Sequence, residues 1–338
     1  MSATAESNAA TKPPVKATAA ASRLWGFGVV ALLIILGPVV VYPVLLMKVM
    51  CFALFAAGFN LLLGFGGLLS FGHAAYFGIG SYVSAYAAKA WGWPPEAAVT
   101  AGTAAGALLG VIFGVVAIRR QGIYFAMITL ALAQLIYFVC LQVPFTGGED
   151  GLQSVPRGKL LGLVDLSNDL TLYGVVSVVF FLTLLLVSRI VHSPFGHVLR
   201  AIRDNEARAI SLGYKTVWYR LAVFVLSTVV CALAGAMKAI VFQLASLTDV
   251  HWTTSGEVVL MTLVGGMGTL FGPLVGAAVV VAAEFYLASI GSWVQVIEGG
   301  IFVACVLGFR AGIVGTLADF GRRSIAARQG ASARAAVN

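Results

Sequence analysis

Charged residues are scarce in this sequence. Only 10% of the 338 residues are charged and 60% are apolar, whereas a soluble domain carries about 25% charged residues. This composition excludes an ordinary soluble protein and favours a lipid bilayer as the surroundings of the chain. The net charge of +8 does not indicate nucleic-acid binding, because the basic residues fall between apolar blocks and form no stripe interleaved with aromatics.

Motifs for redox, metal or catalytic chemistry are also missing. The four cysteines lie far apart in apolar stretches, with no C-x-x-C pair and no histidine at metal-ligand spacing, so we expect neither a disulfide nor a metal site. The sequence contains no G-x-x-x-x-G-K-S/T, no H-E-x-x-H and no G-x-S-x-G. We therefore expect a chain that is not an enzyme and holds no cofactor. If ATP drives this protein, partner subunits must bind the ATP.

Apolar blocks of membrane width follow one another along the chain. A hydrocarbon core about 30 Å thick needs roughly 20 apolar residues of helix. The sequence therefore predicts an all-α, polytopic transmembrane helix bundle of about ten spans, within a range of about 8 to 11. The spans are expected near 24–42, 48–65, 68–90, 96–117, 121–143, 171–190, 217–240, 255–267, 270–288 and 293–309.

The ends of the chain differ from this apolar region. Residues 1–22 are rich in Ala, Thr, Ser and Lys and lack apolar periodicity, which predicts a disordered cytoplasmic tail. Residues 23–312 would form the transmembrane domain, and 313–338 a cytoplasmic C-terminal tail.

The distribution of charge predicts the orientation of the bundle. The segment 189–220 holds six basic residues against two acids, so its loop 191–216 is expected in the cytoplasm, together with Arg119-Arg120. The loop 144–170 holds four acids against two basic residues and fits the external side. An even number of spans then leaves both termini in the cytoplasm.

Glycines recur at two kinds of spacing. Those at every fourth position allow membrane helices to pack closely: Gly102, Gly106, Gly110 and Gly114 on one line, and Gly268, Gly272 and Gly276 on another. The similar clusters Gly64–Gly72 and Gly265–Gly272 should break helices, and paired breaks in two halves of a chain indicate a transporter's central pathway. Residues predicted to line this pathway are Gly66, Gly67, Ser70, His73, Gly265, Gly266 and Gly268.

Three ionisable residues leave a second function open. His73 lies in an apolar run, where an ionisable side chain is a functional candidate, although a neutral histidine bonded inside the bundle fits equally well. Glu257 and Glu284 border or enter apolar spans and could carry protons in an ion-coupled secondary carrier for small polar solutes. Neither acid has an obvious partner for a proton relay in the sequence.

Four strings carry a resemblance to a known family. They are Leu63–Tyr82 (LGFGGLLSFGHAAYFGIGSY), Thr146–Leu152 (TGGEDGL), Ser193–Gly213 (SPFGHVLRAIRDNEARAISLG) and Gly265–Gly276 (GGMGTLFGPLVG). In order and spacing they resemble the permeases of branched-chain amino acid ABC importers. The resemblance implies a multi-pass permease of the bacterial inner membrane that works with a second permease subunit, two cytoplasmic ABC ATPase subunits and an external solute-binding protein. Close relatives of that family handle urea, amides and other small solutes.

The segment Ser193–Gly213 also fits a coupling role by its own chemistry. Pro194 can begin a helix, and charged residues alternate with an apolar face, which predicts a short amphipathic helix that an ATPase could grip. Glu206-Ala207 followed by Gly213 loosely resembles the E-A-A...G coupling motif of ABC permeases, although the spacing departs from it. An ordinary solvated loop is the alternative. The predicted coupling residues are Arg200, Ile202, Arg203, Asn205, Glu206, Ala207, Arg208, Leu212 and Gly213.

Overall fold

The computed structural model describes residues 15–160, 162, 164–287, 296–297, 299–300, 303 and 312–316. The chain divides into two units, Met1–Val41 and Tyr42–Asn338. The first unit contains the 26-residue helix α1 (Val15–Val40), which begins inside the segment that the sequence predicted to be a disordered tail. Most of the last expected span and most of the C-terminal tail lie outside the described residues.

The second unit is a bundle of helices. Five helical segments of the described residues are long and apolar enough to cross a membrane, which fits the predicted polytopic architecture; the predicted count of about ten spans stays a prediction. The helices are α2 (Pro43–Asn60), α3 (His73–Ala90), α4 (Pro95–Ala117), α5 (Ile123–Gln142), α6 (Asp169–His192), α7 (Pro194–Asp204), α8 (Glu206–Ser211), α9 (Thr216–Phe242), α10 (Trp252–Gly265) and α11 (Gly272–Leu287). A π-helix, η1 (Leu61–Phe65), continues α2, and three 3-10 turns follow later: η2 (Pro144–Thr146), η3 (Gly148–Asp150) and η4 (Leu247–Asp249).

Local sequence explains where several helices begin. Proline occupies the first turn of α2, α4 and α7, where its missing N–H and fixed φ suit a helix start. Polar caps precede others: Asn168 accepts from the Leu170 amide before α6, and Ser193 accepts from the Gly196 amide before α7.

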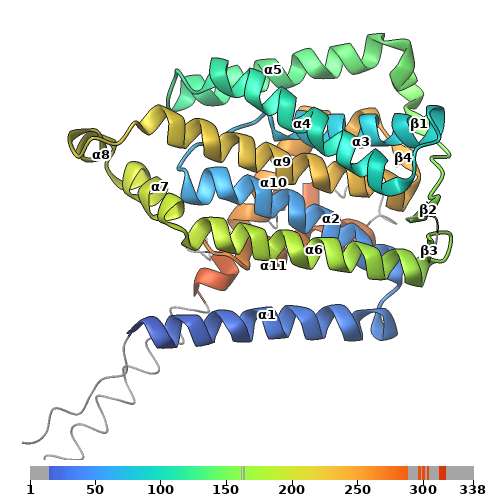
Figure 1. Ribbon diagram of the computed structural model, residues 1–338, viewed down its shortest axis with the longest axis horizontal. Helices are drawn as coiled ribbons and strands as arrows, with labels where there is room; N and C mark the ends of the chain where they lie inside the picture. Colours follow the sequence, from blue (N-terminus) through green and yellow to red (C-terminus); the bar gives the residue numbers. More distant parts are fainter. Residues whose placement is uncertain are drawn as a thin grey trace, which may run out of the picture. The chain divides into compact units, whose positions relative to one another are not determined.

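Helices α2 and α9 form the centre of this unit, with α3 and α4 packed along α9 (Figure 1). In both central helices 78% of the most apolar 18-residue stretch is buried, compared with 28% in α4. The glycine line of α4 explains its close approach, because a Cβ at Gly106 would overlap Ala232 and one at Gly114 would touch Phe224 of α9. The predicted packing role of this line is confirmed.

The same contacts fix which loops share an end of the bundle. Because α4 and α9 run antiparallel, Arg119-Arg120 lies at the end that carries α7 and α8, as the charge pattern predicts. The 24-residue helix α6, about 36 Å long, separates this end from the segment 144–168. Figure 1 shows the short strands at the end opposite α7 and α8. We call these the coupling end and the outer end; their assignment to the two sides of the membrane stays a prediction.

The structure departs from the predicted elements in three respects. Two antiparallel pairs of two-residue strands occur at the outer end, β1 (Leu152–Gln153) with β4 (Leu244–Ala245) and β2 (Lys159–Leu160) with β3 (Val164–Asp165), so the chain is not purely helical. Residues 66–72 are not helical, so the predicted span 68–90 shortens to α3. Helix α10, of 14 residues, is too short to cross a bilayer of about 30 Å unaided.

Candidate translocation and coupling site

Both glycine clusters break helices, as the sequence predicts. The π-helix η1 ends at Phe65 and α3 begins at His73, while α10 ends at Gly265 and α11 begins at Gly272. Within these breaks Gly67, Gly266 and Gly268 have φ values of 70°, 118° and 71°, a backbone region that side chains disfavour. A π-helix beside such a break is itself a common feature of functional sites.

The two breaks contact each other through one buried side chain. Asn60, at the last position of α2, accepts a hydrogen bond from the Gly268 amide at 3.0 Å and donates one to the Thr269 carbonyl at 2.9 Å. Gly64 packs directly against the backbone of Gly268, where a Cβ would overlap it. Segments more than 200 residues apart in the chain therefore form one junction.

Helix α7 is fastened to this junction by Arg203. Its Nη1 donates to the Gly64 carbonyl at 2.5 Å, which satisfies an acceptor freed where the helix breaks. Its Cγ lies against Gly67, and a Cβ built on Gly268 would lie 3.7 Å from Nη1. The same guanidinium contacts the Asp204 carboxylate at 3.1 Å. One side chain thus joins the predicted coupling helix to the first pathway cluster, at the point where Gly64 packs against Gly268 of the second.

His73 lies at the start of α3, fully buried among hydroxyls. Its Nδ1 is 3.0 Å from the Ser70 hydroxyl and its Nε2 is 2.8 Å from the Ser227 hydroxyl. Because the Ser227 hydroxyl donates to the Gly58 carbonyl at 2.6 Å, it accepts from His73, so we assign the proton to Nε2 and let Ser70 donate to Nδ1. This gives a neutral imidazole whose two nitrogens are both satisfied, the structural alternative left open by the sequence.

The apolar face of the coupling segment is turned into the protein. Leu199 and Ile202 are buried where α7 packs against α6, α9 and η1. The sequence placed Ile202 on a surface available to a partner; this is corrected, because an amphipathic stripe shows that a face is covered but not which chain covers it. Arg200 also turns back and donates to the Val191 carbonyl at 3.1 Å.

Glu206 is likewise held within the chain. Its carboxylate accepts from Arg220 at 2.8 Å and from the Thr216 hydroxyl at 3.1 Å, both at the start of α9. Asn205 caps α8 by accepting from the Arg208 amide at 3.0 Å. The residues of the predicted set that remain exposed are Arg203 in part, Asn205, Ala207, Arg208, Leu212 and Gly213. The coupling role of the segment stays a prediction.

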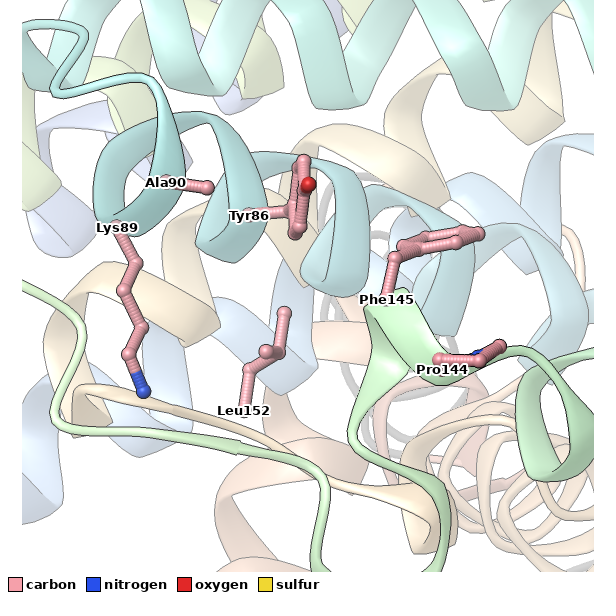
Figure 2. Close-up of a pocket in the computed structure, with 6 residues that line it drawn as sticks. All are labelled: Tyr86, Lys89, Ala90, Pro144, Phe145 and Leu152. Atoms are coloured by element: carbon pink, nitrogen blue, oxygen red, sulfur yellow. The ribbon is translucent and has the colours of Figure 1, made fainter.

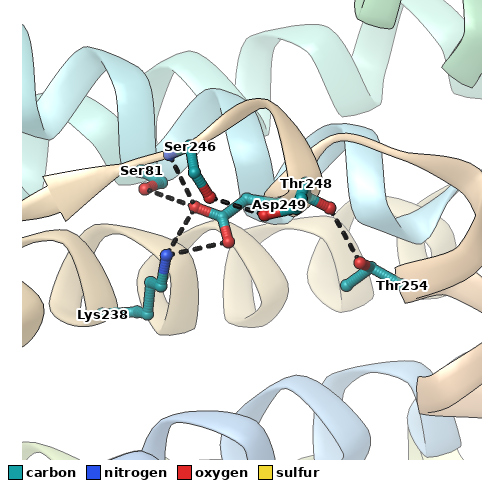
Figure 3. A network of polar contacts seen from close by, with 6 residues as sticks. All are labelled: Ser81, Lys238, Ser246, Thr248, Asp249 and Thr254. Atoms are coloured by element: carbon teal, nitrogen blue, oxygen red, sulfur yellow. Dashed lines mark hydrogen bonds and ion pairs between the residues drawn. The ribbon is translucent and has the colours of Figure 1, made fainter. Parts of the chain in front are cut away.

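A second polar cluster, which the sequence analysis missed, lies at the outer end (Figure 3). The Lys238 ammonium of α9 contacts both carboxylate oxygens of Asp249, at 2.8 and 2.7 Å. Asp249 also accepts from the Ser81 hydroxyl at 3.3 Å and from the Ser246 amide at 3.2 Å. Lys238 falls within the predicted span 217–240, so the rule that singled out His73 could have found it.

A pocket of about 640 Å³ opens at the same end of the bundle. Figure 2 shows Tyr86 and Phe145 on one part of its wall, with Leu152 and Lys89 on another. The lining comes from the last turns of α3, from η2 and from β1. No group of three or more potential metal ligands occurs among the described residues.

Comparison with known proteins identifies the family of this chain. Residues 43–317 match the family model described as the permease component of branched-chain amino acid transport systems. The chain belongs to this family. The matched region contains every helix of the second unit from α2 to α11. It therefore includes both glycine breaks, the coupling segment and the outer cluster of this permease.

Individual relatives carry the same family name. The "High-affinity branched-chain amino acid transport system permease protein LivM" of Salmonella typhimurium and that of Escherichia coli are each 23% identical over 286 residues, covering 76% of this chain. The matched region takes in 66% of each of these relatives. The "Probable branched-chain amino acid transport permease protein LivM" of Methanocaldococcus jannaschii is 27% identical, over 54% of this chain and 53% of its own length. No solved structure matches this permease.

Proposed function

We propose that this chain is a membrane-spanning permease subunit of an ATP-driven importer in the bacterial inner membrane. It translocates branched-chain amino acids, or related small polar solutes, that an external binding protein delivers. A second permease subunit completes the membrane part, and two cytoplasmic ABC ATPase subunits bind the ATP. Family membership and the names of the relatives support the transport role and the class of solute.

The observation that carries this proposal is the contact of Arg203 with Gly64 and Gly67, since Gly64 in turn packs against Gly268 of the second break. A coupling helix must be linked mechanically to the segments that open and close the pathway. The 2.5 Å bond from Arg203 to the Gly64 carbonyl provides such a link without an intermediate element. When the ATPases close, α7 and α8 move with them, and the glycine-rich segments next to Arg203 bend because their backbone tolerates conformations that other residues disfavour.

The ion-coupled carrier gains no support from the described contacts. His73 is bonded on both ring nitrogens to hydroxyl groups, and Glu284 forms an ion pair with Lys48 at 2.9 Å. A proton carrier needs an acid or base that exchanges protons along a connected route, whereas both ring nitrogens of His73 bond to serine hydroxyls and the Glu284 carboxylate is compensated by the Lys48 ammonium. We therefore do not propose this function.

The proposal is tested by reconstituting the permease with its ATPase, second permease and binding-protein partners in liposomes. Leucine uptake is expected to require internal ATP and the binding protein, and to persist when a protonophore removes the proton gradient. Uptake that stops with the protonophore while ATP is held constant would favour the ion-coupled carrier instead. Complexes with an ATPase subunit inactivated at its own nucleotide site serve as the matched control.

Orientation is tested separately in intact cells. An Asn205→Cys variant carries its thiol on the exposed connection between α7 and α8, so a membrane-impermeant maleimide is expected to label it only after lysis. An Asp150→Cys variant in the outer segment should be labelled in intact cells. The reverse pattern would overturn the predicted orientation.

A further inference from the structure

The outer cluster holds two opposite charges away from water. The side chains of Lys238 and Asp249 are only 10% and 8% exposed, although each belongs to a residue type that is seldom buried. Ionisable groups inside membrane segments are costly and frequently mark the path of a solute or an ion. Replacement of a buried ion pair by apolar residues is often neutral or stabilising, so stability alone does not account for this pair.

Opening such a pair sets a strict condition on any solute that passes it. Removing one partner from a buried ion pair leaves the other charge without compensation, which is strongly destabilising. A neutral amide or urea would leave both charges uncompensated, and a simple carboxylate or amine would leave one. A zwitterion supplies a carboxylate for the ammonium and an ammonium for the carboxylate at once, so both charges keep a partner.

Two further hydroxyl groups belong to α3, which contacts the turn η4 that carries Asp249. The Ser81 hydroxyl already donates to Asp249. The hydroxyl of the neighbouring Tyr82 is completely buried and has no hydrogen-bond partner among the described residues. Buried polar atoms are satisfied in the great majority of cases, so an unpaired hydroxyl here is a group with spare bonding capacity.

The segments that carry the pair also line the pocket at the outer end or adjoin its lining. Tyr86, which lines the outer pocket, lies one helical turn beyond Tyr82 on α3. Leu152, on the other wall, pairs with Ala245 in the β1–β4 ladder, immediately before Ser246 of the cluster. Asp249 sits in the turn η4, while Lys238 is fixed in α9, so displacement of this turn would open the pair toward the pocket.

We propose that Lys238 and Asp249 form a recognition pair for zwitterionic α-amino acids. The carboxylate of the solute bonds to Lys238 and its ammonium bonds to Asp249, in place of the bond between the two side chains, and the Tyr82 hydroxyl supplies an additional hydrogen bond. This inference rests on the proposed transport function. It narrows the solute class to amino acids and sets aside the urea and amides that related permeases handle.

Two double variants separate recognition from a structural role. In the exchanged variant, Lys238→Asp with Asp249→Lys, an ion pair can re-form but its polarity is reversed. In the neutral variant, Lys238→Met with Asp249→Leu, no charge is left unpaired, and replacements of this kind are often tolerated by the fold. The control is Arg157→Met with Asp169→Asn, which removes a 2.7 Å ion pair at the same end of the bundle but outside the cluster.

The first measurement is leucine uptake by the reconstituted transporter. Both cluster variants are expected to assemble with their partners and to lose uptake about tenfold or more, corresponding to about 1.4 kcal/mol, whereas the control should retain it. If the exchanged variant transports at the wild-type rate, the pair is only a structural ion pair that holds η4 against α9, and the inference is overturned. Failure of the wild-type transporter to take up any amino acid would instead contradict the proposed function.

The second measurement is made without the binding protein, so that the specificity of that protein does not affect the result. The purified complex, without binding protein, is heated in the presence of leucine, leucinamide or 4-methylpentanoate. A ligand that binds the folded state raises the unfolding temperature, and we expect this for leucine but not for the two analogues that carry a single charged group. The rise should vanish in both cluster variants and persist in the control. An equal rise of the unfolding temperature with all three compounds would show that binding does not require both charges of the solute.

Discussion

The two ends of α9 each carry an ion pair to a neighbouring turn, but the surroundings of these pairs differ. At the coupling end Arg220 binds Glu206, and apolar side chains nearby, those of Leu212 and Trp218, are exposed. At the outer end Lys238 binds Asp249 inside a closed cluster. About 27 Å of continuous helix separates the two pairs.

This difference indicates two distinct uses of one rigid helix. Exposed apolar residues beside the charged start of α8 favour a surface that another protein covers. The closed and buried pair is the one at which we propose that a zwitterionic solute binds. Because α9 is central and packs against α2, α3 and α4, a displacement at one end cannot leave the other unaffected. Changes that alter one end at a time therefore sharpen the comparison.

The largest effect is expected from Asp249→Ala. The change leaves the Lys238 ammonium buried without its counter-charge and should cost about 3–5 kcal/mol of stability. Thermal unfolding of the purified complex measures it. The double variant Lys238→Met with Asp249→Ala should recover most of the loss, because no charge then remains unpaired. Failure of that recovery would mean that packing, not charge, holds the outer end closed.

A smaller loss is expected from Glu206→Ala at the coupling end. Arg220 loses its charged partner and Thr216 its acceptor, but the Glu206 side chain is 24% exposed, so water replaces part of the interaction. We expect a loss of about 1–3 kcal/mol in the same unfolding measurement. Glu206→Gln, which keeps an acceptor oxygen, should fall between this variant and the wild type. A loss equal to that of Asp249→Ala would erase the distinction between the two ends.

Arg203→Met is expected to separate hydrolysis from transport. Without the guanidinium, α7 no longer holds the Gly64 carbonyl, while the buried Leu199 and Ile202 still anchor the helix. Leucine uptake should fall about tenfold, within the range of typical coupling free energies, while ATP hydrolysis by the assembled complex continues. The exposed Arg189→Met, at the end of α6 and outside the predicted coupling set, is the control. A parallel loss of both activities, or of assembly, would instead indicate a purely structural role for Arg203.

The sequence predicts the parts of this site that depend on local chemistry. The glycine clusters indicated the breaks at 66–72 and 266–271, because few other residues adopt positive φ. The sequence did not predict the Lys238–Asp249 pair. The chain must reverse at Gln243, with φ of 55°, to bring the two residues together, and glutamine does not indicate such a turn. Lys238 therefore appeared to be one polar position in a long span, and its partner lay beyond the expected end of that span.

Contacts between distant segments were beyond prediction for a related reason. Asn60 joins the two glycine breaks, yet nothing in the pattern around it distinguishes a bridging amide from a polar residue at a helix end. The side chain of Arg203 was expected to face a partner, whereas it bonds to the Gly64 carbonyl. Periodicity assigns a residue to a face of its helix, and only the packing of the whole chain determines what covers that face.

The smallest effect concerns Leu212, which the sequence placed on the same docking surface as Ile202. The structure separates them, because Leu212 is 71% exposed at the end of α8, whereas Ile202 is 2% exposed on the buried face of α7. Leu212→Ala should weaken binding of the ATPase by about 1 kcal/mol, a roughly fivefold loss, because interface energy is concentrated in a few side chains that become buried. It should leave the unfolding temperature of the isolated chain unchanged, since its side chain contacts solvent there. Ile202→Ala is the matched comparison and should lower that temperature, because it opens a cavity in the chain's own core. Titration of the ATPase onto each purified variant measures the binding. The opposite result would be weaker binding but unchanged stability for Ile202→Ala, with no effect of Leu212→Ala on either. In that case α7 would have to turn its buried face outward when the ATPase docks, and before docking the coupling end would be as buried as the outer end.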